Sequence, residues 1–219
     1  MNRAFQPRHI LILIGVVWLG CSMIATIVRN RVWSSPIAFW SDAVTKSPTK
    51  LRPRINLARA YQESGQYHLS ISEYNTASML AILPSTPFNE RIATRQLAAM
   101  NLGQIYIAHN QLQLAESVLV QVWNEEPGFP GIAANLAIVY LYQSRTQFAK
   151  EVLDAGIESL PAYPWFTASA DLYFNRGVAR QLLGDCDGGL EDIEYAQHIG
   201  IRMPATPNVR PCVVAIKDN

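Results

Sequence analysis

A short motif, an asparagine followed by a bulky residue and then a tiny one, occurs four times along the chain. It starts at Asn56, Asn101, Asn135 and Asn175, and the bulky residues that follow are 45, 34 and 40 positions apart. A period near 34 with short insertions is typical of stacked helical hairpins. Such hairpins cannot bury their apolar faces alone, so they stack and present a concave surface. We therefore expect an all-α solenoid whose function lies on that surface.

The two middle repeats carry the pattern most completely, with tiny, large and proline residues at matching places. One has Asn101, Leu102, Gly103, Tyr106, Ala115, Leu119 and Pro127; the other has Asn135, Leu136, Ala137, Tyr140, Ala149, Leu153 and Pro161. Tiny residues let two helices approach closely, large ones fill the groove between them, and proline ends the second helix. The pattern resembles the tetratricopeptide repeat (TPR) family, which implies about four hairpins over residues 51–204.

The fourth repeat departs from this pattern. It keeps Asn175 and Gly177 but has Arg176 and Arg180 where apolar or aromatic residues are usual in the family. A terminal repeat needs a polar outer face for solubility. We therefore expect both arginines to face solvent.

An apolar segment precedes the repeats. Residues 10–28 carry no charge, and as a helix they would extend about 28 Å, close to the thickness of the hydrocarbon core of a bilayer. Three interpretations fit this segment: a retained membrane anchor, a cleaved signal peptide, or a lipoprotein signal acylated at Cys21. The anchor is favoured because no A-x-A-like site closes the segment. In addition, Trp18 stands where lipoprotein signals usually have leucine, and the residues after Cys21 stay apolar.

The segment after the anchor resembles the junction at which polytopic membrane glycosyltransferases pass from their last membrane helix into TPR repeats. The similarity covers residues 29–48, including Trp33, Phe39 and Trp40. It implies a lone helix over residues 36–46 that packs on the first repeat, with the repeats on the non-cytoplasmic side. The 219 residues hold no counterpart of that family's catalytic membrane domain. The resemblance therefore implies how the membrane helix, the lone helix and the repeats are arranged, and it implies no transferase activity. The two flanks of the anchor carry nearly equal positive charge, so charge does not decide its orientation. The expected orientation therefore rests on this resemblance.

These features predict an N-terminal transmembrane helix followed by an α-solenoid of about four TPR hairpins. The expected divisions are a tail over residues 1–9, the membrane helix over 10–28, a linker and lone helix over 29–50, the solenoid over 51–204 and a C-terminal tail over 205–219. We expect a single-pass inner-membrane protein with the solenoid in the periplasm.

Charge and motif content argue against several classes of function. The formal net charge is +1 and no basic stripe is present, so nucleic acid is not an expected partner. The four histidines are scattered without metal-ligand spacing, and no nucleophile elbow, P-loop or dinucleotide motif occurs. We expect no catalytic residues, no metal and no cofactor, and hence a protein that is not an enzyme.

The candidate site is the concave groove. In TPR proteins that bind extended peptides, the repeated asparagines form a ladder that bonds the peptide main chain; the alternative is that each caps local backbone. The predicted groove residues are Asn56, Arg59, Gln62, Met100, Asn101, Gln104, Ile107, Asn135, Ile138, Tyr142, Phe174, Asn175 and Val178. The lysine-rich clamp of chaperone-binding relatives is missing, so a hydrophobic or extended protein segment is the expected partner, and a polytopic membrane protein is one candidate.

Two cysteines outside the anchor leave two interpretations open. In an oxidising compartment Cys186 and Cys212 would form a disulfide that joins the tail to the last repeat. They are otherwise two unrelated buried thiols.

The expected function is a membrane-anchored scaffold in a cell-envelope assembly such as glycan export, pilus biogenesis or protein glycosylation. The alternatives are an accessory subunit of a membrane glycosyltransferase and an outer-membrane lipoprotein chaperone of pilus or secretin type.

Overall fold

The structure is a computed structural model that describes residues 7–164, 166 and 169–200. Helices make up its regular structure in this part of the chain, as the sequence predicts. Their bounds are α1 (Pro7–Val32), α2 (Pro36–Lys46), α3 (Leu51–Glu63), α4 (Tyr67–Ala81), α5 (Phe88–Ala108), α6 (Leu112–Glu125), α7 (Pro130–Tyr142), α8 (Thr146–Glu158), the 3-10 helix η1 (Leu160–Ala162), α9 (Ser169–Leu182) and α10 (Cys186–His198). The chain divides into two compact units, Met1–Glu73 and Tyr74–Asn219.

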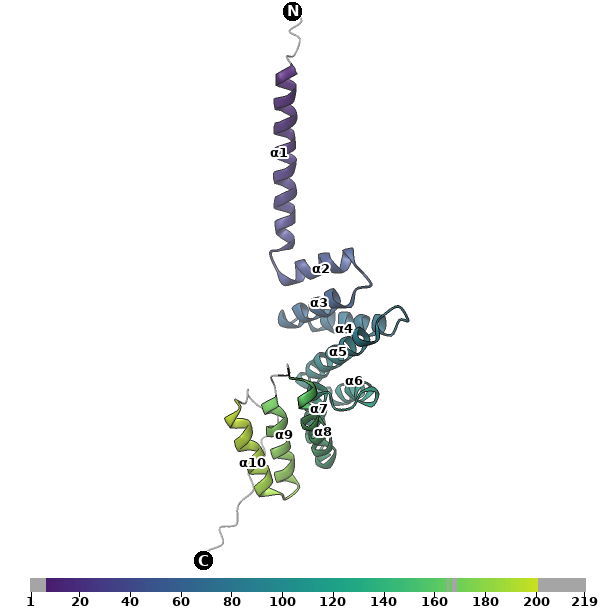
Figure 1. Cartoon of the computed structure of the whole chain (residues 1–219), viewed down its shortest axis with the longest axis vertical. Coiled ribbons are helices and arrows are strands. Elements are labelled where there is room, and N and C mark those ends of the chain that lie inside the picture. Colours follow the sequence, from purple (N-terminus) through teal and green to yellow (C-terminus); the bar gives the residue numbers. More distant parts are fainter. Residues whose placement is uncertain (1–6, 165, 167–168, 201–219) are drawn as a thin grey trace, which may run out of the picture. The chain divides into compact units, whose positions relative to one another are not determined.

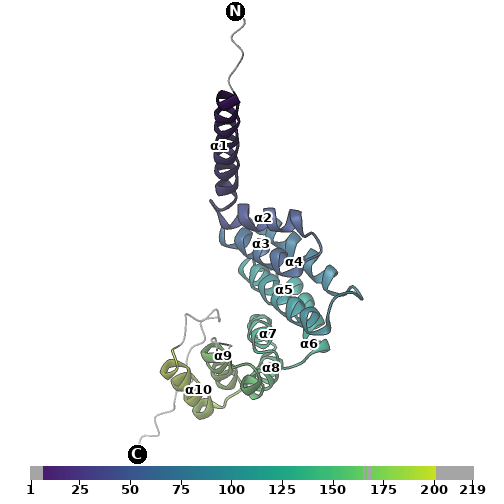
Figure 2. The same ribbon diagram turned by 45° about the horizontal axis from the view of Figure 1, so that its top comes forward.

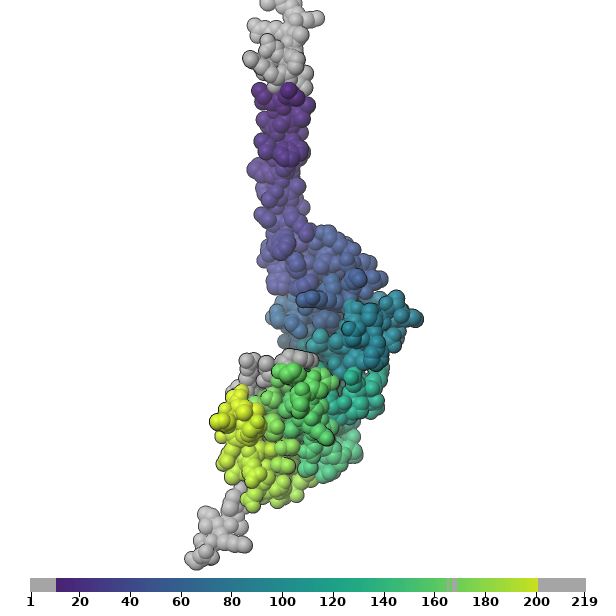
Figure 3. All heavy atoms as spheres, in the orientation of Figure 1, coloured from purple at the N-terminus to yellow at the C-terminus, as the bar shows by residue number. Residues whose placement is uncertain are grey.

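Helix α1 of the first unit is long and apolar enough to cross a membrane. Within Leu11–Val32, an apolar stretch of 18 residues has a mean hydropathy of 2.5, and none of that stretch is buried against the rest of the protein (Figure 3). The hydroxyl of Thr26 donates to the Ser22 carbonyl at 2.8 Å, so this polar group is satisfied within the helix. A membrane anchor and a signal sequence both fit such a helix.

Helix α2 begins directly after α1 for local reasons. Ser35 is the N-cap, its hydroxyl accepts from the Ala38 N–H at 3.1 Å, and Pro36 takes the first helical position, where its missing N–H costs nothing. The Arg29 guanidinium of α1 lies 3.2 Å from the Asp42 carboxylate of α2. Helix α2 packs on α3, and Arg54 of α3 pairs with Glu73 of α4 at 2.8 Å.

The second unit stacks the hairpins α5–α6, α7–α8 and α9–α10 (Figures 1 and 2). Its core centres on α7, where Ile132, Leu136 and Val139 are fully buried. The repeat positions Leu119 and Leu153, on the second helices of the middle hairpins, are fully buried as well. Burial at these matching places explains the recurring leucines of the sequence pattern.

All four hairpin turns share one geometry, which accounts for the motif spacing. A residue with positive φ follows each first helix: Gly65 (76°), Asn110 (56°), Ser144 (58°) and Gly184 (91°). The N–H of the next residue then bonds back to the carbonyl of Tyr61, Tyr106, Tyr140 and Arg180, respectively, at 2.8 to 3.0 Å. This closure satisfies a carbonyl at the end of the helix and reverses the chain.

The expectation that Arg176 and Arg180 face solvent is wrong. The Arg176 side chain is 15% exposed and pairs with Asp192 of α10 at 2.6 Å and with Asp154 of α8 at 3.2 Å. Arg180 also reaches Asp192, at 3.0 Å. The hydrogen bonds that the Arg176 guanidinium donates to the Asp192 carboxylate outweigh desolvation and raise the pKa of Arg176. An ion-pair network therefore replaces the apolar contact usual at this position.

Cys186 begins α10 and is disulfide-bonded, whereas Cys21 of α1 is an exposed free thiol. Cys212, which the sequence suggests as the partner of Cys186, lies outside the described residues. Their pairing stays a prediction.

Candidate functional site: a pocket between the first helices of three hairpins

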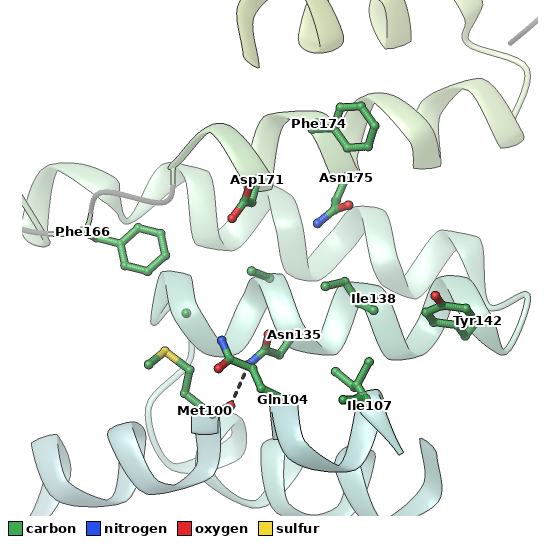
Figure 4. A pocket seen from close by; sticks show the side chains of 13 residues that line it. Met100, Gln104, Ile107, Asn135, Ile138, Tyr142, Phe166, Asp171, Phe174 and Asn175 are labelled. Carbon is green, nitrogen blue, oxygen red and sulfur yellow. Dashed lines mark hydrogen bonds between the residues drawn. The ribbon is translucent and has the colours of Figure 1, made fainter. Parts of the chain in front are cut away.

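A pocket of about 660 Å³ lies in the second unit, between α5, α7 and α9. These are the first helices of their hairpins, and α7 packs on both α5 and α9. The lining is mainly apolar with four polar side chains, and consists of Met100, Gln104, Ile107, Ala108, Gly131, Ala134, Asn135, Ile138, Tyr142, Phe166, Asp171, Phe174 and Asn175 (Figure 4). It has the size and composition of a ligand-binding cleft.

Helical periodicity brings these residues to one surface. On α7, Gly131, Asn135, Ile138 and Tyr142 follow one another at steps of four, three and four residues, which places them on one helix face. Gly131 also leaves room for the Met100 side chain of α5, because a Cβ there would lie 2.6 Å from the Met100 sulfur. A tiny residue at this position thus helps to shape the pocket.

The three repeated asparagines of the second unit differ in what they bond. Asn135 Nδ2 donates to the Met100 carbonyl at 2.9 Å, across from α7 to α5, as Figure 4 shows. Asn101 Nδ2 donates to the Leu97 carbonyl of its own helix at 2.7 Å. Asn175 is 2% exposed, and within the described part its Oδ1 atom has no hydrogen-bond partner. The Asn101 amide nitrogen thus bonds local backbone and the Asn135 amide nitrogen bonds the backbone of another helix, whereas no described group donates to the buried Asn175 oxygen.

Eight of the predicted groove residues line this pocket: Met100, Gln104, Ile107, Asn135, Ile138, Tyr142, Phe174 and Asn175. Asn101 and Val178 do not, and with 8% and 5% exposure they are packed inside the repeat. Asn56, Arg59 and Gln62 lie on α3 in the first unit. A partner-binding role for any of these residues stays a prediction.

Five lining residues were absent from the predicted set: Ala108, Gly131, Ala134, Phe166 and Asp171. Gly131 and Asp171 precede Asn135 and Asn175 by four residues, and the helical period alone would have pointed to them. Phe166 follows η1, and only the course of the chain between α8 and α9 brings it to the pocket.

Charge in the pocket is sparse. Asp171 is the single acidic residue among the described lining residues, and that lining has no lysine or arginine. Across the described part of the chain, no group of three or more histidine, cysteine, aspartate and glutamate side chains is placed to hold a metal ion. The pocket therefore offers an apolar surface with one carboxylate and a few amide groups.

No protein-family profile matches the sequence, and no curated protein matches it. Among solved structures, a chain of the APC/C hetero-tetramer Cut9–Hcn1 superposes with a TM-score of 0.60 at 18% identity, over 75% of this chain and 29% of that one. MamA superposes with a TM-score of 0.55 at 15% identity, over 74% of this chain and 85% of that one. YrrB, described as a TPR protein with an unusual peptide-binding site, gives 0.52 at 14% identity over 82% of each chain.

Because the sequence identities are low, these structural similarities show a shared fold and nothing more. They confirm the prediction of an all-α chain with TPR-like paired hairpins behind an apolar N-terminal helix.

Proposed function

We propose that this protein is a membrane-anchored scaffold that holds an extended segment of a partner protein in the pocket between α5, α7 and α9. The observation that carries the proposal is the pocket itself, which the first helices of three successive hairpins build together. Stacked helical repeats use such surfaces to bind other chains. YrrB, which shares the fold, has a peptide-binding site.

The proposed location is the inner membrane, with the solenoid in the periplasm. Helix α1 continues without interruption from Cys21 to Val32, which favours a retained anchor over a lipoprotein signal that ends at the cysteine. The disulfide bond at Cys186 supports an oxidising compartment for the repeats, because the cytosol keeps thiols reduced. The partner then belongs to an envelope assembly such as glycan export, pilus biogenesis or protein glycosylation.

A second candidate is an accessory subunit of a membrane glycosyltransferase. It is favoured by the junction, where α2 follows α1 after a three-residue turn, is tied to it by Arg29 and Asp42, and packs on α3. A polytopic partner would in that case lie beside α1 in the membrane.

The test is a pull-down of the full-length protein from native membranes in mild detergent, with mass spectrometry of bait and prey. Gln104 is exposed and lines the pocket, so Gln104→Trp should fill part of the pocket without disturbing the fold. We expect a partner that binds the wild type and is lost with Gln104→Trp, whereas Glu191→Gln, an exposed change on α10, should retain it.

The identity and mass of the recovered proteins separate the candidates. A stoichiometric polytopic partner supports the accessory-subunit candidate. A bait that begins at an acylated Cys21 overturns the anchor in favour of the lipoprotein. A partner that binds Gln104→Trp as well as the wild type contradicts the pocket as its binding site.

A further inference from the structure

The pocket between α5, α7 and α9 contains a buried acceptor that the protein leaves without a hydrogen bond. Asn175 of α9 is 2% exposed, its amide points into the pocket (Figure 4), and no described group donates to its Oδ1 atom. Buried polar atoms in native proteins nearly always have a partner, because leaving one unpaired costs its desolvation penalty. A donor from a bound ligand would remove this cost.

The other polar side chains of the lining are engaged or exposed. Asn135 Nδ2 donates to the Met100 carbonyl at 2.9 Å. Asp171 already takes part in an interaction within the protein, so its charge is not offered to a ligand. Gln104 is exposed. Asn175 is therefore the buried lining residue whose oxygen a ligand can satisfy.

The Asn175 amide can turn its oxygen toward such a ligand. Oδ1 is covered in this structure, so a donor reaches it only when the amide rotates about its last torsion. That torsion is broad in asparagine, and Oδ1 has no hydrogen bond that the rotation would break. The approach of a donor is thus compatible with the surrounding helices as they stand.

The lining favours a bulky apolar group that carries a donor and no charge. Most of its side chains are apolar, among them Met100, Ile107 and Ile138, and the described lining has no lysine or arginine. A ligand cation would lose its hydration here without a free carboxylate to replace it, because Asp171 is engaged. Hydroxyl and amide side chains carry acceptors as well as donors, whereas the indole of tryptophan is a neutral donor only.

We propose that the pocket recognises its partner segment by one tryptophan side chain, whose indole N–H donates to Asn175 Oδ1, an inference that rests on the proposed function. The indole ring packs on the apolar lining side chains, and the large apolar area that it buries provides most of the affinity. The hydrogen bond to Asn175 provides the preference for tryptophan over an aromatic ring without a donor.

The probe is a library of short random peptides displayed on phage and selected against the full-length protein in detergent. We expect the selected peptides to share a tryptophan. A selected peptide is then synthesised twice, once with tryptophan and once with benzothienylalanine, in which a sulfur atom replaces the indole N–H. The Kd of the second peptide for the wild-type protein should be about tenfold weaker, because Asn175 Oδ1 is left unpaired.

A variant of Asn175 shows whether this residue is the acceptor. Asn175→Leu has a similar shape and removes the amide, so it should lose the preference between the two peptides. Glu191→Gln, an exposed change on α10, should keep the wild-type preference. If Asn175→Leu does not fold, the comparison of the two peptides on the wild-type protein still decides whether a donor is recognised.

The outcomes separate the two proposals. Peptides without tryptophan that bind the wild type but not Gln104→Trp overturn the tryptophan preference and leave the scaffold function standing. Equal Kd values for the two synthetic peptides, or a preference that persists in Asn175→Leu, overturn the hydrogen bond to Asn175 alone. Peptides indifferent to Gln104→Trp, or a library from which nothing is enriched, contradict both the pocket's function and the tryptophan site that depends on it.

Discussion

The guanidinium of Arg176 and the carboxylate of Asp192 form two hydrogen bonds inside the last hairpin, with Nε 2.7 Å from Oδ2 and Nη2 2.6 Å from Oδ1. Asp192 is only 5% exposed, and Arg180 approaches the same carboxylate at 3.0 Å. Two arginines of α9 thus depend on one aspartate of α10, which makes Asp192 the residue that holds these helices together electrostatically.

Replacing Asp192 by alanine should therefore be strongly destabilising. Removing one partner of a buried pair leaves uncompensated charge and costs about 3–5 kcal/mol in the free energy of unfolding. Urea unfolding of Asp192→Ala measures this, and Glu191→Ala, an exposed neighbour, should stay within about 0.5 kcal/mol of wild type. The double change Arg176→Leu with Asp192→Leu should recover only part of the loss, because Arg180 still loses its contact with Asp192. Equal stability of Asp192→Ala and wild type would show that the network contributes nothing.

Two glycines of the repeat motif should respond differently to alanine. At Gly177 a Cβ would lie 2.6 Å from the backbone oxygen of Gly189, which cannot move away without separating α9 from α10. We expect Gly177→Ala to cost about 1–3 kcal/mol. At Gly103 the Cβ would meet the Leu119 side chain at 2.8 Å, which can adjust, and the gain in helix propensity of about 1 kcal/mol offsets part of the strain. Thermal unfolding of both variants tests this order, and a larger loss at Gly103 would refute it.

Asn135→Ala should destabilise the protein more than Asn101→Ala. The Asn135 amide joins α7 to α5 through the Met100 carbonyl, whereas the Asn101 amide bonds within its own helix. Loss of a buried hydrogen bond costs about 1–3 kcal/mol when a partner is left unsatisfied. Chemical denaturation of both variants gives the comparison. Identical unfolding midpoints would mean that the bond between helices adds no stability.

Acid should weaken the α6–α7–α8 region through Glu116. Burial of the Glu116 carboxyl opposes its ionisation and by itself would raise its pKa. Hydrogen bonds that Gln143 and Arg145 donate to it, at 2.9 Å and 2.5 Å, together with the positive charge of Arg145, outweigh burial and lower the pKa. A folded pKa below the unfolded value of about 4.3 gives stability that is present above that pH and is lost as pH falls through the folded pKa.

The expected contribution is at most about 1 kcal/mol, because Glu116 and Arg145 are both partly exposed. Thermal unfolding from neutral to acid pH should show a shallower dependence for Glu116→Gln than for wild type. Glu191→Gln should follow the wild-type curve. A Glu116→Gln curve parallel to wild type at every pH would rule out this linkage.

Much of the fold was predictable because the repeat residues act locally. Ala115, Leu119, Ala149 and Leu153 were recognisable by spacing, and all four are fully buried. Eight predicted groove residues line one pocket because helical periodicity places them on the first helices of their hairpins. Phe166 was not predictable by that means, since it lies outside any helix and its position depends on the path between η1 and α9.

By itself the sequence determined the helical hairpins, their approximate number and the apolar N-terminal helix, because these depend on residue types at short, regular spacing. Only the tertiary structure decided which polar groups are satisfied. It turned Arg176 inward to Asp192, assigned the Asn135 amide to Met100 and left the Asn175 oxygen open in the pocket. The physical reason is that hydrogen bonds and ion pairs depend on atoms from different helices meeting within about 3 Å, a condition that no one-dimensional period encodes.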